Sequence, residues 1–553
     1  MKLKKINKLL LLIVSVVLFG ACEDHFKIDP LTEIDEAKQF SSKTGYYSAL
    51  YGVYLEMAGY DMYGAKMRYY LFDDLAQTFA DSKWSSRFEG SNGMYDYETN
   101  EPIKAELDLL WNKHYNLIAN LNNLLENLED GSATKEMFPD GNYEILIAES
   151  KALRAFFHFN LVKIFAPSIA SDEAADAIPY MNKFDINTIA PSTVREVYNK
   201  IIKDLEDAEA LLAVHEPLLQ AETEDEKDEM LATYNVSSEE RLRELGFRSN
   251  RLARFNYYAV QALLAKVYLY AGNNEKAYEY AEEVLNNAHQ QLNFGISFLY
   301  QDGTIFGVSV DEDGQYDKVK SDFTTERKIF PDNLEALYEV DLLSTSEAVS
   351  ISYWDSEEVK ALKQPVVDWL NQNTTAVQYY YMEGSSSYNT GTFVLREKGT
   401  YLPVEPSPGD NDIRWMNFKY SYFFNQYSVL VNSNWVSPIH KKGLNYFDLL
   451  NHHEIKLIAA ETASSTADQL QHLNELRGMY SLAPLETTDI DTEEKLEIEI
   501  EKEYKKNFYG KGELFFYFKR KNKDTFKGIN QFPVENAIDD NIYVLPYPLG
   551  EGF

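Results

Sequence analysis

Apolar side chains recur at helical spacing over segments much longer than one turn, and this periodicity constrains the fold more than any other feature. The clearest stripe lies between Glu106 and Leu128, and its members are Leu107, Leu110, Trp111, Tyr115, Ile118, Leu121, Leu124, Leu125 and Leu128. Residues three and four apart share one face of an α-helix. The stripe therefore predicts a long amphipathic helix that packs against other helices.

The same periodicity predicts helices along most of the chain. They are expected over Glu36–Met57, 66–79, Glu144–Phe165, Phe255–Tyr270, Asn274–Leu285, Leu444–Ala463, Thr466–Tyr480, Leu496–Phe508 and Gly512–Lys521. Another helix carries the apolar positions from Val197 to Leu212, and Thr193 followed three residues later by Glu196 predicts its capping box. The charge-rich residues 215–248 are interpreted as a surface insertion. The predicted fold class is mostly α.

Two predicted helix pairs, over 106–165 and 255–285, have the pattern of tetratricopeptide-type units. In the second pair, small residues occupy one face of each helix, namely Ala259, Ala262, Ala265, Ala277 and Ala281. Small residues let antiparallel helices pack closely, and such pairs stack into a solenoid. We therefore expect a tetratricopeptide-like scaffold of helical pairs, an α-α superhelix.

Residues 288–445 differ in character, because Gly, Ser, Pro and Asp are scattered among short apolar runs. Tyr379–Tyr381 and Thr392–Leu395 are strand-like, and Val359–Leu370 has a helical pattern. A long irregular region is typical of functional loops. We predict a helical region over 36–287, a loop-rich variable lobe with short strands over 288–445, and a second helical region over 446–553.

The first residues have the pattern of a secretory signal. Four lysines precede an apolar run from Leu9 to Gly20, which is shorter than the roughly 20 residues that span a bilayer. Cys22 is the single cysteine, so no internal disulfide or multi-cysteine metal site can form. Residues 18–22 resemble a bacterial lipobox, with Phe19 in place of the usual leucine. We predict a signal peptide over 1–21, lipid on Cys22 and a lipidated tether over 22–35. The alternative is an ordinary signal peptide that is cleaved at another position, with Cys22 as an incidental buried cysteine.

The charge of the chain excludes one class of partner. The formal net charge is −35 at pH 7, and removal of the signal peptide would take away four lysines and no acid. A surface this acidic repels phosphate backbones and anionic lipid. We therefore expect no nucleic-acid partner and no membrane contact other than the lipid anchor.

Several stretches, taken in order, resemble the SusD/RagB family of outer-membrane nutrient-binding lipoproteins. They are Tyr115–Asn122, Ala148–Phe156, Val197–Leu212, Ala262–Tyr270, Glu454–Glu461, Leu473–Arg477, Glu503–Phe508, Gly512–Arg520 and Leu545–Pro548. The acidic pair Glu23–Asp24 after Cys22 is similar to the surface-export signal of Bacteroidetes lipoproteins. The chain departs from the family at Glu454–Leu457, where an arginine-leucine-alanine-glutamate run is more usual.

The resemblance implies what such a protein does. It implies a SusD-like fold, a place on the cell-surface side of the outer membrane, and a TonB-dependent SusC-like outer-membrane barrel as the partner. It also implies binding of an oligosaccharide or, less often, a peptide, with no cofactor and no bond cleavage. Two alternatives to this binding function stay open, which are a surface glycosidase and a helical adaptor that binds only protein.

Sugar rings stack their apolar faces on aromatic planes, while their hydroxyls need polar partners. The segment around residue 84 has this composition, and its candidate ligand-binding residues are Trp84, Arg87, Tyr95 and Tyr97. Second choices, in the variable lobe, are Tyr300, Trp354 and Tyr388. The alternative for each aromatic residue is that it anchors its own loop on the core.

No catalytic or metal-binding motif is found. Asp73–Asp74 is expected to have a solvated or capping role, since adjacent acids arise by chance among 88 acidic residues. An EF-hand at Asp311–Gly314 is excluded, because Lys320 falls where a bidentate glutamate is required. His452–His453 lacks the four-residue histidine spacing of a zinc helix. We therefore expect a protein that binds rather than catalyses, without metal or cofactor.

The prediction of lipidation is tested by mass spectrometry of the mature N-terminus. A lipid-modified Cys22 as the first residue is the expected result, because the apolar run ends immediately before it. An unmodified thiol at this position would contradict the prediction.

Overall fold

The computed structural model describes residues 36–291, 304–309, 377–382, 392–397 and 446–548, with gaps at 65, 69, 79–94, 130–132, 186, 188, 222, 224, 227–245, 249–250, 252–253, 480–481, 483, 489, 509–510, 528–532, 536 and 539–540. The chain divides into two compact units, Met1–Ser48 and Ala49–Phe553. The described part of the first unit holds α2 (Glu36–Gln39) and the start of α3 (Lys43–Ala58). The description below concerns the second unit.

Helices dominate the described residues, which confirms the mostly α fold class. The longer helices are α6 (Glu101–Glu129), α7 (Asn142–Phe165), α9 (Val194–His215), α12 (Tyr257–Tyr270), α13 (Asn274–Gln291), α19 (His452–Thr462), α20 (Thr466–Met479) and α21 (Glu493–Phe508). Shorter helices are α4 (Leu71–Leu75), α8 (Ile169–Asp172), α22 (Leu514–Arg520), a π-helical turn at Tyr60–Gly64, and 3₁₀ turns at Lys135–Met137, Pro139–Gly141, Pro217–Gln220 and Gly246–Arg248.

The described strands form two-stranded antiparallel sheets. The pairs are β1 (Asp176–Ile178) with β2 (Ser192–Thr193), β3 (Thr304–Ser309) with β6 (Tyr446–Asn451), β4 (Val377–Met382) with β5 (Thr392–Glu397), and β7 (Phe526–Lys527) with β8 (Pro533–Val534). In the β4–β5 pair, Tyr379 lies opposite Leu395 and Tyr381 lies opposite Phe393. The strand character predicted for both segments is confirmed.

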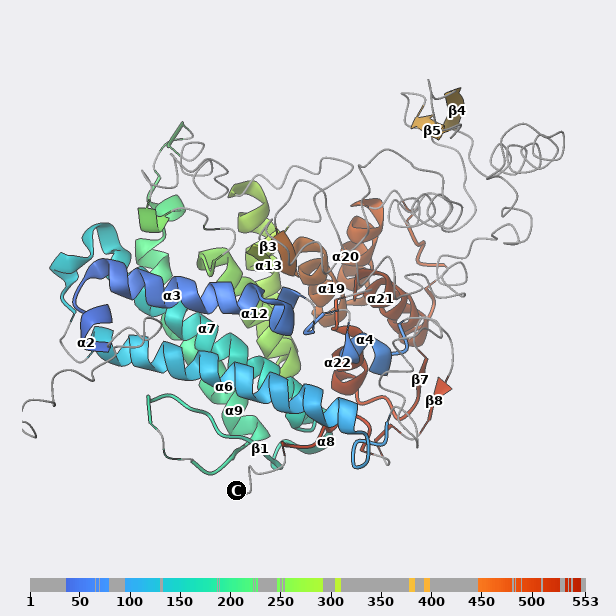
Figure 1. Cartoon of the computed structure of the whole chain (residues 1–553). Helices are drawn as coiled ribbons and strands as arrows, with labels where there is room; N and C mark the ends of the chain where they lie inside the picture. The colour runs from blue at the N-terminus through green and yellow to red at the C-terminus, as the bar shows by residue number, and fades with distance from the viewer. Residues whose placement is uncertain are drawn as a thin grey trace, which may run out of the picture. The chain divides into compact units, whose positions relative to one another are not determined.

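The long helices stack in series (Figure 1). Helix α6 packs on α7, α7 on α9, α9 on α12, α12 on α13, α13 on α19, and α19 on α20. The contact between α13 and α19 continues the stack across the long segment that separates them in the sequence. The predicted scaffold of helical pairs is confirmed for these elements.

The α12–α13 pair shows why small residues matter. All five alanines predicted to face one another, Ala259, Ala262, Ala265, Ala277 and Ala281, are fully buried. Asn256 begins α12 by accepting a hydrogen bond from the Ala259 amide at 2.9 Å. The pair is joined by a turn at Gly272, whose φ of +75° suits glycine. Close packing of these two helices therefore follows directly from the sequence.

Three predicted helices differ from the structure, and the first of them, predicted over Glu36–Met57, is divided into α2 and α3 by a turn at 40–42. Only Leu71–Leu75 is an α-helix within the predicted 66–79. Residues 446–451, predicted as the start of a helix, form β6 because they pair with β3 from the variable lobe. Asn451 is extended and its side chain accepts the Glu454 amide at 2.8 Å, so the helix begins only at His452. The capping box of Thr193 and Glu196 is confirmed, and Val359–Leu370 lies outside the described residues.

Asp73 and Asp74 are both buried, which corrects the expectation of a solvated pair. The Asp73 carboxylate accepts a hydrogen bond from the Thr78 hydroxyl at 3.0 Å and from the Gly512 amide at 3.2 Å. Asp73 caps neither α4 nor α22, since α4 begins after Tyr70 and α22 has no side-chain cap; it instead satisfies a backbone amide far along the chain. Asp73 therefore joins α4 to the segment that begins α22.

A buried ionic cluster links the two helical regions. Lys163 on α7 and Lys266 on α12 both contact Glu513 at the start of α22, at 3.0 and 3.1 Å. Lys266 also contacts Glu454 on α19 at 2.9 Å. Charges this well buried need their partners, because an unpaired buried charge costs several kcal/mol. The cluster therefore holds residues 446–548 against the N-terminal helices.

His158 on α7 is buried and held as a neutral ring. Its Nδ1 lies 2.9 Å from the Arg154 carbonyl oxygen, and its Nε2 accepts the Met181 amide at 3.0 Å. Tyr180 stacks on the ring at 3.9 Å between centroids. Burial lowers the pKa of His158 to about 3. Protonation would place a second N–H against the Met181 amide, so only the neutral ring fits.

His158 predicts a pH dependence of stability. The unfolded chain protonates this histidine near pH 6.5 and the folded chain does not, so the free energy of unfolding falls as pH decreases from about 6.5 toward 3. One histidine contributes a slope of about 1.4 kcal/mol per pH unit. Urea unfolding between pH 7 and 4.5 should show a shallower slope for His158→Gln, which still accepts from Met181. Equal slopes for the two proteins would contradict this account.

Candidate functional site

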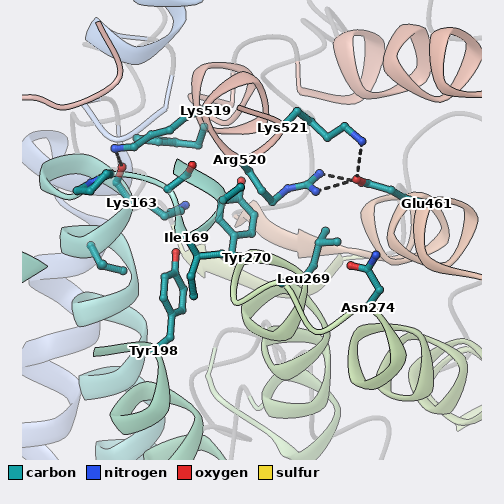
Figure 2. A pocket seen from close by; sticks show the side chains of 16 residues that line it. Lys163, Ile169, Tyr198, Leu269, Tyr270, Asn274, Glu461, Lys519, Arg520 and Lys521 are labelled. Carbon is teal, nitrogen blue, oxygen red and sulfur yellow. Dashed lines mark hydrogen bonds and ion pairs between the residues drawn. The ribbon is translucent and has the colours of Figure 1, made fainter. Parts of the chain in front are cut away.

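A cavity of about 250 Å³ lies where α7, α8, α9, α12, α13, α19 and α22 meet. Figure 2 shows its lining side chains. They come from α7 and the turn after it (Val162, Lys163, Pro167, Ser168), from α8 and α9 (Ile169, Ala170, Tyr198), from α12 and the start of α13 (Leu269, Tyr270, Gly272, Asn274), and from α19 and α22 (Glu461, Phe516, Lys519, Arg520, Lys521).

The cavity has an exposed rim and a buried floor. Ala170, Gly272 and Asn274 are exposed, so the mouth lies beside α8 and the α12–α13 turn. Deeper in the cavity, Tyr198 is only 3% exposed and Lys519 only 4%. A ligand entering at the turn would therefore reach side chains that are largely removed from bulk water.

Arg520 and Glu461 form a bidentate ion pair on one wall. Nη1 and Nη2 of Arg520 each donate to one carboxylate oxygen of Glu461 at 2.7 Å. Burial by itself raises the pKa of the Glu461 carboxyl, but the charge and hydrogen bonds of Arg520 outweigh it and hold this pKa at about 2. Lys521 approaches the same carboxylate at 3.4 Å. Glu461 therefore stays ionised at every physiological pH.

Lys519 is a second cation of the lining, and it is held differently. Its Nζ donates to the backbone carbonyl of Lys163 at 2.6 Å, at the last turn of α7 (Figure 2). None of the acids that the structure describes forms an ion pair with it. Burial lowers the pKa of Lys519 well below its usual value, and the charge of Lys163 lowers it further. Lys519 is therefore a buried amine without a carboxylate partner.

Tyr198 and Tyr270 place two phenol groups in the cavity (Figure 2). The Arg520 guanidinium lies 5.3 Å from the centroid of the Tyr270 ring, a cation–π distance. Burial raises the pKa of both phenols, so both remain neutral. The site thus presents cations and neutral hydroxyls around one enclosed space, an arrangement suited to binding a polar ligand.

The arrangement does not suit glycoside hydrolysis. Such catalysis uses two carboxyl groups on either side of the bond, one of them protonated. Glu461 is the single carboxylate in the lining, and it is ionised and paired. Among the residues that the structure describes, no group of three or more His, Cys, Asp or Glu could hold a metal ion.

Of the residues predicted from sequence to bind ligand, Tyr95 and Tyr97 are described, and neither lines this cavity. Trp84, Arg87, Tyr300, Trp354 and Tyr388 lie outside the described residues, as does Cys22. Tyr95 and Tyr97 are described in the turn before α6.

Tyr97 corrects one of these predictions. It is buried, and its hydroxyl donates to the Ile542 carbonyl at 2.7 Å, so it anchors its loop on the core and offers no open face to a sugar. Tyr95 is half-buried and its hydroxyl donates to the Leu75 carbonyl at 2.7 Å. Part of the Tyr95 ring stays accessible, so Tyr95 remains a candidate.

Sequence reasoning missed the cavity itself. Its lining combines helices that are more than 300 residues apart, such as α7 and α22, and only their packing brings them together. One local signal was available in the sequence. Lys519, Arg520 and Lys521 directly follow the apolar residues 514–518 of α22. Three consecutive cations at the end of a buried helix are costly unless the fold gives them partners or a ligand.

The stacked helical pairs and the enclosed polar cavity define a tetratricopeptide-like binding scaffold. Residues 48–222 match the SusD-like family described as starch-binding associating with outer membrane. No curated protein matches the sequence. Residues 48–222 therefore resemble this family, and the chain shares its fold with solved SusD-like structures.

Solved structures show how far the fold is shared. A SusD-like protein from Bacteroides fragilis has 16% identity and a TM-score of 0.54, with 94% of this chain and 96% of that chain covered. A SusD superfamily protein from Bacteroides thetaiotaomicron has 18% identity and a TM-score of 0.51, with 92% and 96% covered. A SusD-like carbohydrate binding protein from Bacteroides vulgatus has 17% identity and a TM-score of 0.51, with 88% and 85% covered.

Among the described residues, no helix combines the length and the apolar character needed to cross a membrane. This observation concerns only the part of the chain that the structure describes.

The ion pair in the cavity wall predicts a large effect of one substitution. Glu461→Gln should lower the free energy of unfolding by about 3–5 kcal/mol, because it leaves the buried Arg520 without a counter-charge. The matched control is Glu475→Gln, whose partner is Lys456 and whose side chain is 41% exposed. The control should cost less than about 1 kcal/mol. Urea denaturation measures both, and similar losses would contradict the importance of the buried pair.

Proposed function

We propose that this chain is a cell-surface lipoprotein that binds a glycan and delivers it to a SusC-like, TonB-dependent outer-membrane barrel. The observation that carries the proposal is the match of residues 48–222 to a family described as starch-binding and associated with the outer membrane. The fold supports it, since one of the similar structures is named a carbohydrate binding protein. The lipobox-like sequence before Cys22 supplies the anchor in this proposal.

The proposed glycan-binding surface includes Trp84, Arg87 and Tyr95, with Tyr300, Trp354 and Tyr388 as further contacts from the variable lobe. An aromatic ring gives the sugar an apolar face, while a guanidinium beside it donates hydrogen bonds to hydroxyls. Tyr95 supports this placement because its hydroxyl is fixed to the Leu75 carbonyl while the residue is only half-buried. A rigid ring loses little conformational entropy when a ligand stacks on it.

Binding without catalysis is part of the proposal. The cavity of the described fold carries a single, paired carboxylate, which supports binding over hydrolysis. A peptide ligand is the alternative within the same family, and a surface glycosidase is the alternative outside it. The glycosidase alternative is tested by incubating the purified protein with glycans. Release of reducing ends, at a rate that one carboxylate substitution abolishes, would favour the enzyme.

The transporter partner is tested by pull-down from solubilised outer membrane, with and without glycan. Recovery of a barrel protein by the lipidated chain is the result that the proposal requires. Recovery of other proteins alone, unaffected by glycan, would favour a protein-binding adaptor instead.

The glycan site predicts the effect of Trp84→Ala. Once a glycan array has identified a ligand, calorimetry should show that this variant loses affinity by on the order of 1 kcal/mol, about fivefold, because a stacking platform is removed. Phe184→Ala is the control, since Phe184 is an exposed aromatic residue in the loop between β1 and β2. The control should bind as the unmodified protein does. Unchanged affinity in Trp84→Ala would remove Trp84 from the site.

A further inference from the structure

The cavity of Figure 2 is lined by two buried tyrosines, Tyr198 and Tyr270, whose hydroxyl oxygens are open to the space of the cavity. Tyr198 is 3% exposed and Tyr270 is 8% exposed. No residue in the described part of the chain forms a hydrogen bond with either phenol oxygen. Neither oxygen is among the described polar atoms that are fully buried without a partner, so each hydroxyl can donate to a molecule inside the cavity. Both groups line the same enclosed space, so a molecule bound there would satisfy both.

The charge of the lining favours an anionic molecule. Four of its side chains are cationic, Lys163, Lys519, Arg520 and Lys521, and one is acidic, Glu461. Lys163 has Glu513 and Lys521 has Glu497 as further partners, at 3.0 and 3.1 Å. Lys519 has no acid partner among the described residues. Burial lowers the pKa of this amine well below its usual value, and an anion in the cavity would stabilise its charged form.

The hydrogen-bonding groups left over in the lining are mainly donors. The Glu461 carboxylate is already used, since it accepts from Arg520, Lys521 and the Tyr504 hydroxyl. The remaining donors are the hydroxyls of Tyr198 and Tyr270, the Asn274 amide at the rim, and the Arg520 Nε–H, which is buried and has no hydrogen-bond partner among the described residues. A ligand that accepts several hydrogen bonds and carries negative charge matches this set.

The size of the cavity sets the scale of the ligand. About 250 Å³ is many times the roughly 10–15 Å³ that one water molecule requires by the same kind of measure. The mouth between α8 and the α12–α13 turn is open to solvent through Ala170 and Gly272.

The negative net charge of the whole chain repels an anion in this cavity only weakly, because charges more than about 8 Å apart are screened at physiological salt unless they are buried.

We propose that this cavity is a binding site for an oxyanion, a carboxylate or sulfate group, that accepts hydrogen bonds from the hydroxyls of Tyr198 and Tyr270 beside the cations of α22. The anion is either free or carried on a sugar, as in a uronic acid or a sulfated monosaccharide. The site is distinct from the proposed glycan surface at Trp84. It does not depend on the proposed function, because its evidence is the geometry of the cavity alone.

The test is calorimetric titration of the purified protein at constant ionic strength. The probes are sodium sulfate, sodium acetate, glucuronate, glucose 6-sulfate and neutral glucose. The key variant is Tyr198→Phe combined with Tyr270→Phe, which removes both hydroxyls and changes nothing else in the lining. Because these hydroxyls have no protein partner, the variant should unfold at the same urea concentration as the unmodified protein. Tyr268→Phe is the control, since Tyr268 is on α12 but its hydroxyl donates to Glu206 at 2.8 Å.

Saturable binding of sulfate or acetate, weakened at least about tenfold in the double variant and unchanged in Tyr268→Phe, is the expected result. Equal affinities for free and sugar-borne anions identify the anion itself as the ligand, and tighter binding of glucuronate or glucose 6-sulfate identifies an acidic sugar. The proposal is overturned if no oxyanion binds, if glucose binds as tightly as glucuronate, or if the double variant binds anions as well as the unmodified protein. Glycan binding that fails in Trp84→Ala but leaves sulfate binding intact would separate the two sites.

Discussion

The buried cluster of Lys163, Lys266, Glu454 and Glu513 is the interaction on which the rest of the described fold depends. It draws one residue each from α7, α12 and α19 and one from the start of α22, and its contacts are 2.9–3.1 Å long. Apolar packing alone would let helices slide past one another with little change in energy. A buried charge accepts only its own partner at its own position, because a mismatched charge stays desolvated and unpaired. The cluster therefore selects one docking of the C-terminal helices.

The cavity is a consequence of that docking. Lys163 and Glu513 fix α7 beside α22, and this contact carries Lys519 and Arg520 to the side of Tyr198 and Tyr270. Arg520 is then fixed by Glu461 of α19, so the wall of the cavity is rigid. A site built on paired helices rather than on loops keeps its donors in place before a ligand arrives, which lowers the entropy lost on binding.

The tyrosines illustrate how one residue type serves two purposes. Tyr97 and Tyr180 are buried, and their hydroxyls bond to the Ile542 carbonyl and to Asp204. Such residues supply both apolar area and a polar bond that fixes a loop or a helix. Tyr198 and Tyr270 are equally buried but leave their hydroxyls unused by the protein. The contrast identifies a binding site more clearly than the number of tyrosines does, because these two hydroxyls are open to the cavity and available to a ligand.

The sequence by itself determined most of the helices, the capping box of α9 and the close pairing of α12 with α13. These features depend on residues within a few turns of one another, such as Thr193 with Glu196 and the alanines of 259–281. Only the tertiary structure decided that Tyr446–Asn451 is a strand, that Asp73 is buried, that Tyr97 is an anchor, and that α22 completes a cavity with α7 and α9. In each of these cases the deciding partner lies more than 100 residues away. Periodicity measures how a residue relates to its neighbours in the chain, whereas long-range ion pairs and strand pairing depend on which distant surfaces meet.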